Sequence, residues 1–374
     1  MLFTFLLAFI VRLLSVAQSI QNLEHLFDKT LERGDIHNGF LIIHSDSLNL
    51  QLNLAKGKNS DGTPVSTDMP FLTTSIAKTM TATLVMMLAE EGKLSLEAPA
   101  ANYLPENLIK GFHMLEGEDY GHKISISHLL QHRSGLSDYF GDTPREGENM
   151  LNRIFAEPEK FWTAEEIITF TKEHFQAHFV PGSGFHYSDT NYVLLAMIIE
   201  RLCGQPLHEV LRNQIFSPLD MQHSSLYLRS EPNKASQQPA ELYAGPYEIS
   251  GYRSLSADWG GGGMLSTSQD LYRFLSALLS EKLVSATSLQ RMQAWTGESL
   301  GTYYGYGLRK FDLGELYPAL SGLSLIGHSG TSSAFMYYCP ELDIYLIGSF
   351  NQIDFYRDCH TFLADVLLSL KSSL

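Results

Sequence analysis

Hydrophobic and polar positions follow two different periods at the start of the chain. Apolar residues recur at helical spacing from residue 20 to 31 and predict an amphipathic helix that ends at Gly34. In the segments 39–45 and 49–55, by contrast, apolar residues form a short run and then alternate with polar ones. That pattern is typical of strands, and Asp46 lies between the two segments. We therefore predict an antiparallel hairpin after the first helix.

The end of the chain repeats this plan. Segments 334–339 and 344–350 are rich in aromatic and branched residues and flank a turn, and apolar residues from 359 to 370 then share one helical face. Two hairpins and two terminal helices predict one antiparallel sheet with the helices packed on it. We expect an α+β fold in which residues 18–73 and 300–374 form a discontinuous α/β domain.

The middle of the chain has a different character. Residues 74–299 are mainly helical in pattern and rich in loops, so they are expected to form a region inserted into the sheet domain, with a site between the two. Within this region, residues 141–160 and 229–253 are polar and contain proline and glycine. They are expected to be long surface loops.

One predicted helix contains a single charge. Between Ser75 and Ala89 the only ionisable side chain is Lys78, and Gly92 provides a stop signal. The helix is apolar almost all round, which predicts that it is buried. A buried lysine is costly unless it is paired or has a chemical role.

Ser75 and Lys78 lie one helical turn apart on the same face. The serine is expected at the helix start, where free N–H groups favour developing negative charge. Burial lowers the pKa of a lysine, and a neutral amine can accept the serine proton. The S-x-x-K spacing occurs by chance about once in such a chain, so it is weak by itself. In the alternative interpretation, Lys78 reaches a carboxylate and Ser75 only caps the helix.

Composition excludes some functions. The chain has 374 residues, enough for roughly two domains, and a formal net charge of −15. This charge argues against a nucleic-acid partner, which would require a basic face.

The three cysteines form no disulfide framework. We expect free buried thiols, although Cys339 and Cys359 could pair in an oxidising compartment.

The first residues, MLFTFLLAFIVRLLSVAQS, are apolar and short. Ser15 and Ala17 have the spacing that signal peptidase prefers, so residues 1–17 are interpreted as a signal peptide and the protein as periplasmic or secreted. Arg12 makes this leader atypical. An apolar N-terminal helix, or a start codon placed too early, is the alternative. No other segment is expected to span a membrane.

Several common sites are absent from the sequence. It contains no H-E-x-x-H, no phosphate-binding G-x-x-x-x-G-K-[ST], no G-x-G-x-x-G and no G-x-S-x-G. His128 and His132 have a spacing that can bind metal, but without a third ligand a structural or capping role is favoured. The glycine run at 259–265 is interpreted as a tight turn or a close backbone approach near a cleft, and Thr267 as a helix start. We expect no metal and no cofactor.

Two further stretches change the interpretation. PGSGFHYSDTNYVLLAMIIERLCG places Tyr187 just ahead of an apolar helix, and LIGHSGTSSAF places His328, Ser329 and Gly330 at the end of a strand. With Ser75 and Lys78, their order resembles the three motifs of the serine β-lactamase and penicillin-binding hydrolases. The resemblance is strongest to the class C β-lactamase-like branch, which also contains D-alanyl-D-alanine carboxypeptidases, D-aminopeptidases and esterases. It extends from about Asn38 to the C-terminus.

The resemblance implies a β-lactamase/transpeptidase-like fold and a role for each motif. Ser75 would be the acylated nucleophile, Lys78 its activating partner, and Tyr187 a base or an acid for the leaving group. The backbone N–H groups of Ser75 and Thr331 would form the oxyanion hole. The strand carrying His328, Ser329 and Gly330 would line the cleft.

Two positions depart from the family pattern. Asp189 stands where the β-lactamases have asparagine, and His328 stands in place of the lysine of K-T-G. A carboxylate favours a cationic Lys78 and cannot donate an amide hydrogen bond, and a neutral imidazole attracts a substrate carboxylate only weakly.

These departures favour a serine hydrolase that acts through an acyl-enzyme on an ester or a peptide-like amide. The alternatives are a β-lactamase, a D-alanyl-D-alanine carboxypeptidase, or an inactive binding or scaffold protein with the same fold. The expected partner is a small-molecule or peptide-like substrate, and the oligomeric state stays open.

Overall fold

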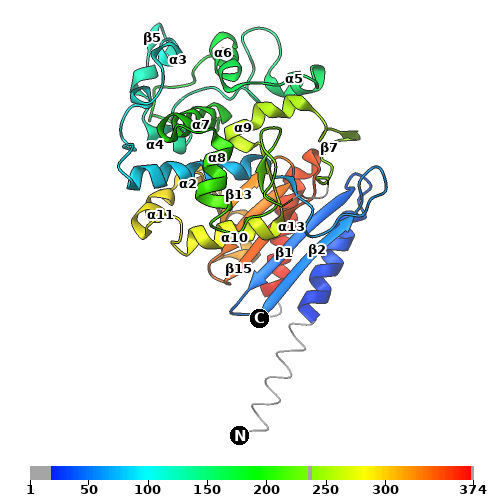
Figure 1. Cartoon of the computed structure of the whole chain (residues 1–374). Helices are drawn as coiled ribbons and strands as arrows, with labels where there is room; N and C mark the ends of the chain where they lie inside the picture. Colours follow the sequence, from blue (N-terminus) through cyan, green and yellow to red (C-terminus); the bar gives the residue numbers. More distant parts are fainter. Residues whose placement is uncertain (1–17, 235–237, 372–374) are drawn as a thin grey trace.

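The computed structural model describes residues 18–234 and 238–371 of the chain. A large antiparallel sheet and a mainly helical region lie against each other (Figure 1). The predicted leader, residues 1–17, lies outside the described residues. Within the described part of the chain, no helix has both the length and the apolar character needed to cross a membrane.

The large sheet has eight strands in the order β10-β11-β12-β13-β14-β15-β1-β2. Every neighbouring pair is antiparallel. The strands, in chain order, are β1 (Asn38–Ser45), β2 (Leu50–Gly57), β10 (Thr296–Ser299), β11 (Thr302–Tyr304), β12 (Arg309–Asp312), β13 (Ser324–Gly330), β14 (Ala334–Cys339) and β15 (Ile344–Ser349).

Strand β1 joins the two ends of the chain. It pairs with β2 on one side and with β15 on the other, where Phe40 lies opposite Ser349 and Ile42 opposite Ile347. Both predicted hairpins and the single antiparallel sheet are therefore confirmed. Strand β10 also belongs to this sheet, although it lies in the stretch expected to be helical. Its residues, Thr-Gly-Glu-Ser, lack the apolar alternation that reveals a strand in sequence.

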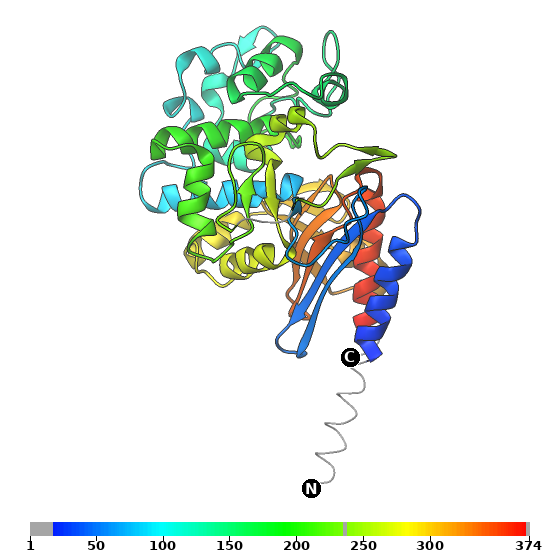
Figure 2. The ribbon, with the colours of Figure 1, turned by 45° about the vertical axis from the view of Figure 1, so that its right-hand side comes forward.

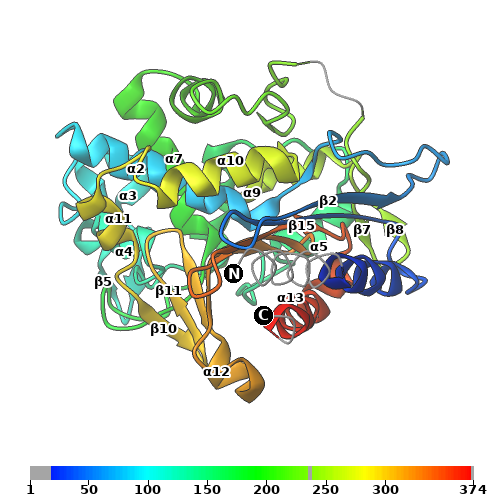
Figure 3. The ribbon, with the colours of Figure 1, turned by 90° about the horizontal axis from the view of Figure 1, so that it is seen from below.

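The two terminal helices cover one face of the sheet and lie side by side (Figures 2 and 3). They are the N-terminal helix (residues 18–31) and α13 (Tyr356–Lys371). Phe27 and Phe362 contribute from the two helices to one buried cluster with Phe350, with ring centroids 5.7 Å apart for Phe27–Phe350 and 5.0 Å for Phe350–Phe362. Aromatic packing of this kind joins the chain ends to the sheet.

The opposite face of the sheet packs on the helical region. Helix α10 (Ser268–Leu279) lies against β1, β14 and β15, and begins where Thr267 accepts a hydrogen bond from the Asp270 N–H, as the sequence predicts. Helix α2 (Ala77–Glu90) runs through the same core and is buried along nearly its whole length. The predicted all-apolar helix is therefore confirmed.

The other elements include one long helix, α7 (Asp189–Cys203), and a number of shorter helices and strands. The remaining α-helices are α3 (Glu106–Ile109), α4 (Ile126–Leu130), α5 (Met150–Ala156), α6 (Ala164–His174), α8 (Leu207–Leu211), α9 (Trp259–Gly262), α11 (Ala286–Met292) and α12 (Leu313–Leu316). A small sheet has the order β3 (Phe71–Leu72), β9 (Met264–Ser266) and β6 (Ser225–Leu226), and two hairpins are formed by β4 (Met114–Leu115) with β5 (Glu118–Asp119) and by β7 (Tyr243–Ala244) with β8 (Tyr247–Glu248).

Two predicted loops contain regular structure. The stretch 141–160 includes α5, which begins where Asn149 caps the helix and which buries Met150 and Ile154. The stretch 229–253 includes the hairpin β7–β8. Both elements are short, so their apolar pattern is too brief to stand out in sequence.

All three cysteines are free thiols. Cys339 and Cys359 are buried separately, and the Cys359 thiol donates to the Ser333 carbonyl oxygen. The expectation of free buried thiols is confirmed for this pair, and the alternative disulfide is not formed.

Candidate active site

Ser75 lies in a single 3-10 turn, Thr74–Ile76, that leads directly into α2. The residue before it, Thr74, has a φ of 46°, which is unusual for a β-branched side chain. Ser332 holds this strained residue, because its backbone N–H donates to Thr74 Oγ1 at 3.3 Å. Ser75 lines a cavity of about 440 Å³. The turn therefore presents the serine to open space, and no side-chain cap of α2 uses it.

Lys78 is fully buried and contacts Ser75. Its Nζ donates to Ser75 Oγ at 3.0 Å, to the Gly261 carbonyl oxygen at 2.8 Å, and to the Asp189 carboxylate. Burial alone lowers the pKa of a lysine, but the negative charge of Asp189 outweighs that effect and raises the pKa of Lys78 above its ordinary value. The carboxylate at position 189 thus favours the cationic form of Lys78, in line with the expectation for this departure from the family pattern. Lys78 is a paired cation that also contacts the serine.

Gly261 explains why the glycine run lies beside the lysine. A Cβ at this position would lie 2.6 Å from Asp189 Oδ1, which is too close for any side chain. The absence of a Cβ lets the backbone carbonyl of α9 reach the ammonium group. The predicted close backbone approach is confirmed.

Asp189 begins α7, and two other acids lie near it. Its backbone N–H donates to Asp138 Oδ1 at 3.0 Å. Burial and the charge of Asp189 raise the pKa of Asp138 to about 7 and the pKa of Asp258 well above its ordinary value. The ammonium of Lys78 is therefore paired with Asp189, while burial makes ionisation of Asp138 and Asp258 less favourable than usual.

Tyr187 lies two residues before Asp189, in the loop that leads into α7, and lines the same cavity. Its ring centroid is 5.1 Å from Lys78 Nζ and 4.2 Å from the ring of His132. Burial raises the pKa of its phenol, and the charge of Lys78 opposes this shift only in part. Ser75, Lys78 and Tyr187, which the sequence singles out, thus come together around one cavity.

His132 holds the loop that carries Tyr187 through hydrogen bonds. Its Nδ1 accepts hydrogen bonds from the Ser188 N–H at 3.1 Å and from the Asn191 amide at 3.0 Å. His128 instead forms a capping box with Ser125 at the start of α4. The two histidines therefore have structural roles, as expected, and do not form a metal-binding pair.

The end of strand β13 lies against the serine turn. A Cβ on Gly330 would lie 2.2 Å from the Thr73 carbonyl oxygen, so only glycine allows this approach. Ser329 and Thr331 line the cavity. This geometry places the strand carrying the third motif beside Ser75.

His328 differs from what its motif position suggests. It is fully buried and is not among the residues that line the cavity. Its Nδ1 donates to the Ser329 carbonyl oxygen at 2.7 Å, so Nε2 accepts from the Tyr304 hydroxyl at 3.0 Å. Burial and the nearby Arg309 charge lower its pKa well below 6.5. This imidazole is neutral and does not line the cavity.

Arg309 supplies the positive charge that His328 lacks. Its guanidinium binds Glu298 through two hydrogen bonds, Nε–Oε2 at 2.8 Å and Nη2–Oε1 at 2.7 Å, and both residues line the cavity. The side chain is only 7% exposed. The sequence did not indicate this pair, because Arg309 lies in the short strand β12 and Glu298 in the polar strand β10, with no motif spacing between them.

The rest of the cavity wall is mainly apolar. Several of its residues come from the long segments around α5 and the β7–β8 hairpin, which the sequence could not place. The apolar and aromatic residues that line it are Phe140, Leu151, Ile154, Phe155, Leu242, Ile249, Leu255, Ile353 and Tyr356. Such a wall suits an uncharged, hydrophobic group next to the serine.

Comparisons with known proteins agree with this geometry. The sequence profile of the Beta-lactamase family matches residues 24–361. A penicillin-binding protein of Bacillus subtilis (strain 168) is 26% identical over 306 residues, which cover 77% of this chain and 62% of that protein. Esterase EstB of Burkholderia gladioli is 26% identical over 356 residues, 85% of each chain. The chain thus spans about six tenths of the first relative and most of the second.

Solved structures show the same architecture. A D-amino acid amidase from Ochrobactrum anthropi SV3, complexed with L-phenylalanine, superposes with a TM-score of 0.76 at 24% identity, over 96% of this chain and 99% of that one. A penicillin-binding protein from Bacillus halodurans gives 0.69 at 19% identity, over 92% and 98%. These similarities confirm the expected α+β, β-lactamase/transpeptidase-like fold.

Proposed function

Because this chain belongs to the Beta-lactamase family, whose profile matches most of its length, we propose that it is a serine hydrolase that forms an acyl-enzyme on Ser75. One observation carries the proposal. The Ser75 hydroxyl lies on the wall of a cavity, 3.0 Å from the buried ammonium of Lys78, which can relay the serine proton to Asp189.

The proton route that we propose takes account of the cationic Lys78. As Ser75 Oγ attacks the carbonyl carbon, its proton passes to Lys78 Nζ while another Nζ proton passes to Asp189 Oδ1. The new Oγ–C bond forms, and the π electrons of the carbonyl move onto its oxygen. Lys78 remains an ammonium and Asp189 becomes neutral, so the charge moves from the carboxylate to the oxyanion. General acid–base help of this kind is typically worth 10²–10⁴-fold in rate.

The remaining groups have proposed roles in the same reaction. The backbone N–H groups of Ser75 and Thr331 are proposed to bind the oxyanion, and one such donor is typically worth about 10²–10³-fold. Tyr187 is proposed to give its proton to the leaving group as the carbonyl re-forms, and to recover a proton from Asp189 through Lys78. Water then attacks the acyl-enzyme by the same route in reverse and releases Ser75.

The proposed substrate is an ester or a peptide-like amide with an uncharged, hydrophobic acyl group. The apolar cavity wall supports this choice, and so does the Arg309–Glu298 pair, whose charges cancel. Asp189 offers no amide donor and His328 does not line the cavity, which makes a β-lactam a poorer fit. One relative, Esterase EstB of Burkholderia gladioli, is named for activity on esters, which supports this class.

A labelling experiment tests the proposal. A fluorophosphonate probe should attach to Ser75, and Ser75→Ala should abolish both the label and p-nitrophenyl ester turnover. Ser280→Ala, on an exposed serine at the end of α10, is the matched control and should retain both. Full turnover by Ser75→Ala would refute the assignment. Ligand binding without turnover or adduct in the unaltered protein would instead favour a binding or scaffold role, which the paired state of Lys78 would explain.

A further inference from the structure

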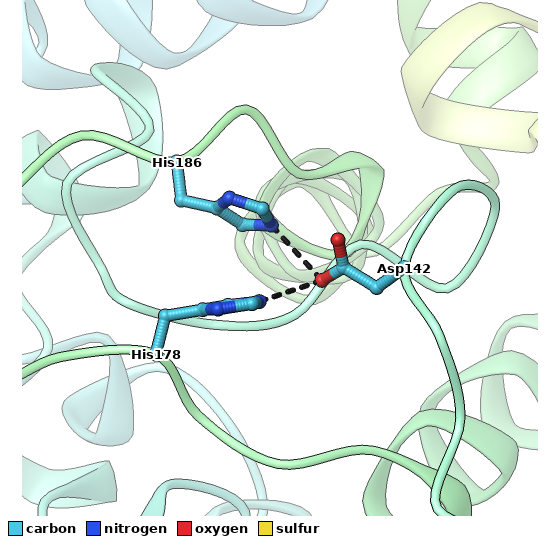
Figure 4. A group of neighbouring side chains, drawn as sticks. All are labelled: Asp142, His178 and His186. Carbon is cyan, nitrogen blue, oxygen red and sulfur yellow. Dashed lines mark hydrogen bonds and ion pairs between the residues drawn. The ribbon is translucent and has the colours of Figure 1, made fainter.

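A second group of polar side chains lies next to the cavity. Asp142, His178 and His186 come from two loops, and both imidazole rings direct Nε2 at the same Asp142 oxygen, at 2.7 and 2.9 Å (Figure 4). The three possible ligand atoms all lie within 4.8 Å of one another. The two rings lie close together, with centroids 3.8 Å apart and their planes tilted by 37°. The sequence indicated no metal here, because the three residues show no recognised ligand spacing.

These residue types suit a divalent late transition metal. Zinc binds histidine nitrogen and carboxylate oxygen at about 2.0–2.2 Å, so tetrahedral ligand atoms lie about 3.3 Å apart. The observed Nε2–Oδ2 distances are shorter by a few tenths of an ångström, so a small rotation of each ring would admit the ion. The side chains of His178, His186 and Asp142 are 39%, 27% and 18% exposed, which gives an ion a path and leaves room for water as a fourth ligand.

We propose that Asp142, His178 and His186 bind one divalent transition-metal ion, with Zn²⁺ as the preferred species. The ion binds Nε2 of each ring, and each neutral imidazole then carries its proton on Nδ1 instead of Nε2. Two neutral imidazoles and one carboxylate leave the loaded site with a net charge of about +1. No redox step is involved.

The ion would tie together the two loops that frame the reactive groups. The Asp138 N–H donates to the same Asp142 oxygen at 2.8 Å, and Asp138 in turn accepts from the Asp189 N–H at 3.0 Å. On the other side, His186 directly precedes Tyr187. Hydrogen-bonded neighbours of this kind orient metal ligands and are oriented by them. The metal therefore has a positioning role, and its binding is independent of whether the proposed hydrolase reaction occurs.

Calorimetric titration tests the site directly. The full chain, without a histidine tag and stripped with a chelator, is titrated with ZnCl₂, and one ion per chain should bind with a dissociation constant of micromolar or below. His178→Ala and His186→Ala should each weaken binding by at least tenfold. His122→Ala, an exposed histidine that contacts Glu106, is the matched control and should bind as the unaltered protein does.

Two further measurements keep the outcome decisive. Co²⁺ in place of Zn²⁺ should give the absorption bands of a tetrahedral histidine site, and these should vanish in His178→Ala. His178→Gln keeps a donor toward Asp142, so it guards against a loss that reflects only misfolding, and it should also fail to bind. Zinc should raise the Tm of the unaltered protein and of His122→Ala, but not that of the His178 and His186 variants. The proposal would be overturned if the unaltered protein showed no saturable binding. It would also be overturned if the His178 and His186 variants bound zinc as tightly as the unaltered protein.

Discussion

Asp189 holds the proton on Lys78: its carboxylate accepts a hydrogen bond from the buried ammonium that also contacts the serine hydroxyl. A neutral amide at this position could not stabilise the ammonium in the same way. The ionisation of Asp189 therefore sets the state of the whole reactive group. Four predictions follow from this pair and from the walls of the cavity around it.

Replacing Asp189 by asparagine changes the charge on Lys78. Without the carboxylate, burial dominates and the pKa of Lys78 falls below its present raised value, so kcat/KM for a p-nitrophenyl ester should rise with pH as the amine loses its proton. The new amide N–H also gives a β-lactam a donor, and its hydrolysis should increase roughly three- to tenfold, the worth of about one hydrogen bond. The pH–rate profile of Asp138→Asn, whose side chain does not bind Lys78, provides the comparison. An unchanged profile in Asp189→Asn would contradict the proposed proton route.

His328 should make stability fall in acid. Its folded pKa lies well below the unfolded value of about 6.5, so the unfolded state binds the extra proton first. The contribution of this neutral ring is fully present above pH 6.5 and is lost as the pH falls. His328→Gln keeps a donor to Ser329 and an acceptor for Tyr304 but cannot titrate.

Urea unfolding at pH 7.5, 6.0 and 5.0 measures this effect. Below pH 6.5 the free energy of unfolding of the unaltered protein should fall more steeply than that of His328→Gln, by up to about 1.4 kcal/mol per pH unit. Parallel curves for the two proteins would show that the ring is not kept neutral by the fold.

Glu298→Gln should change which substrates are preferred. The substitution leaves the buried Arg309 guanidinium with no charged partner on the cavity wall, so kcat/KM for an ester with a carboxylate on its acyl group should rise relative to a neutral ester. A shift of about tenfold corresponds to 1.4 kcal/mol. Steady-state kinetics with a matched pair of neutral and anionic esters measures the ratio, and an unchanged ratio would place the charge of Arg309 out of reach of the substrate.

Acyl-chain length should report on the apolar wall. Each methylene that leaves water is worth about 0.8 kcal/mol, so kcat/KM should rise by about fourfold per methylene from acetate to butyrate esters. Leu151 is 45% exposed and lines the cavity, and Leu151→Ser should lower the rate for butyrate more than for acetate. Met114→Ser, an exposed apolar residue outside this cavity, should leave the ratio unchanged. Equal losses for both esters would show that Leu151 does not contact the acyl chain.

Local patterns made most of the fold predictable. Apolar periodicity identified both hairpins, the terminal helices and the buried helix, because each of these elements buries one continuous face. The one-turn spacing of Ser75 and Lys78 fixed their contact, since helix geometry alone brings such side chains together. These features depend on residues close in sequence.

Features that depend on distant residues were not predictable. The charge of Lys78 depends on Asp189, which lies on another helix, and only the family resemblance, not a local pattern, indicated that the two residues meet. Arg309 and Glu298 meet only because β10, β11 and β12 are neighbours in the sheet. Whether His328 is buried or lines the cavity depends on how the face of β13 that carries it is covered. The motif alone does not predict this.

The pairing of β1 with β15 has a consequence for how the chain is made. A ribosome must deliver the chain as far as Ser349 before Phe40 can meet that residue. Until then α10, which packs on β1, β14 and β15, lacks part of its cover, and slow, long-range pairing of this kind favours aggregation. Newly synthesised chains should therefore depend on chaperones more strongly than completed ones.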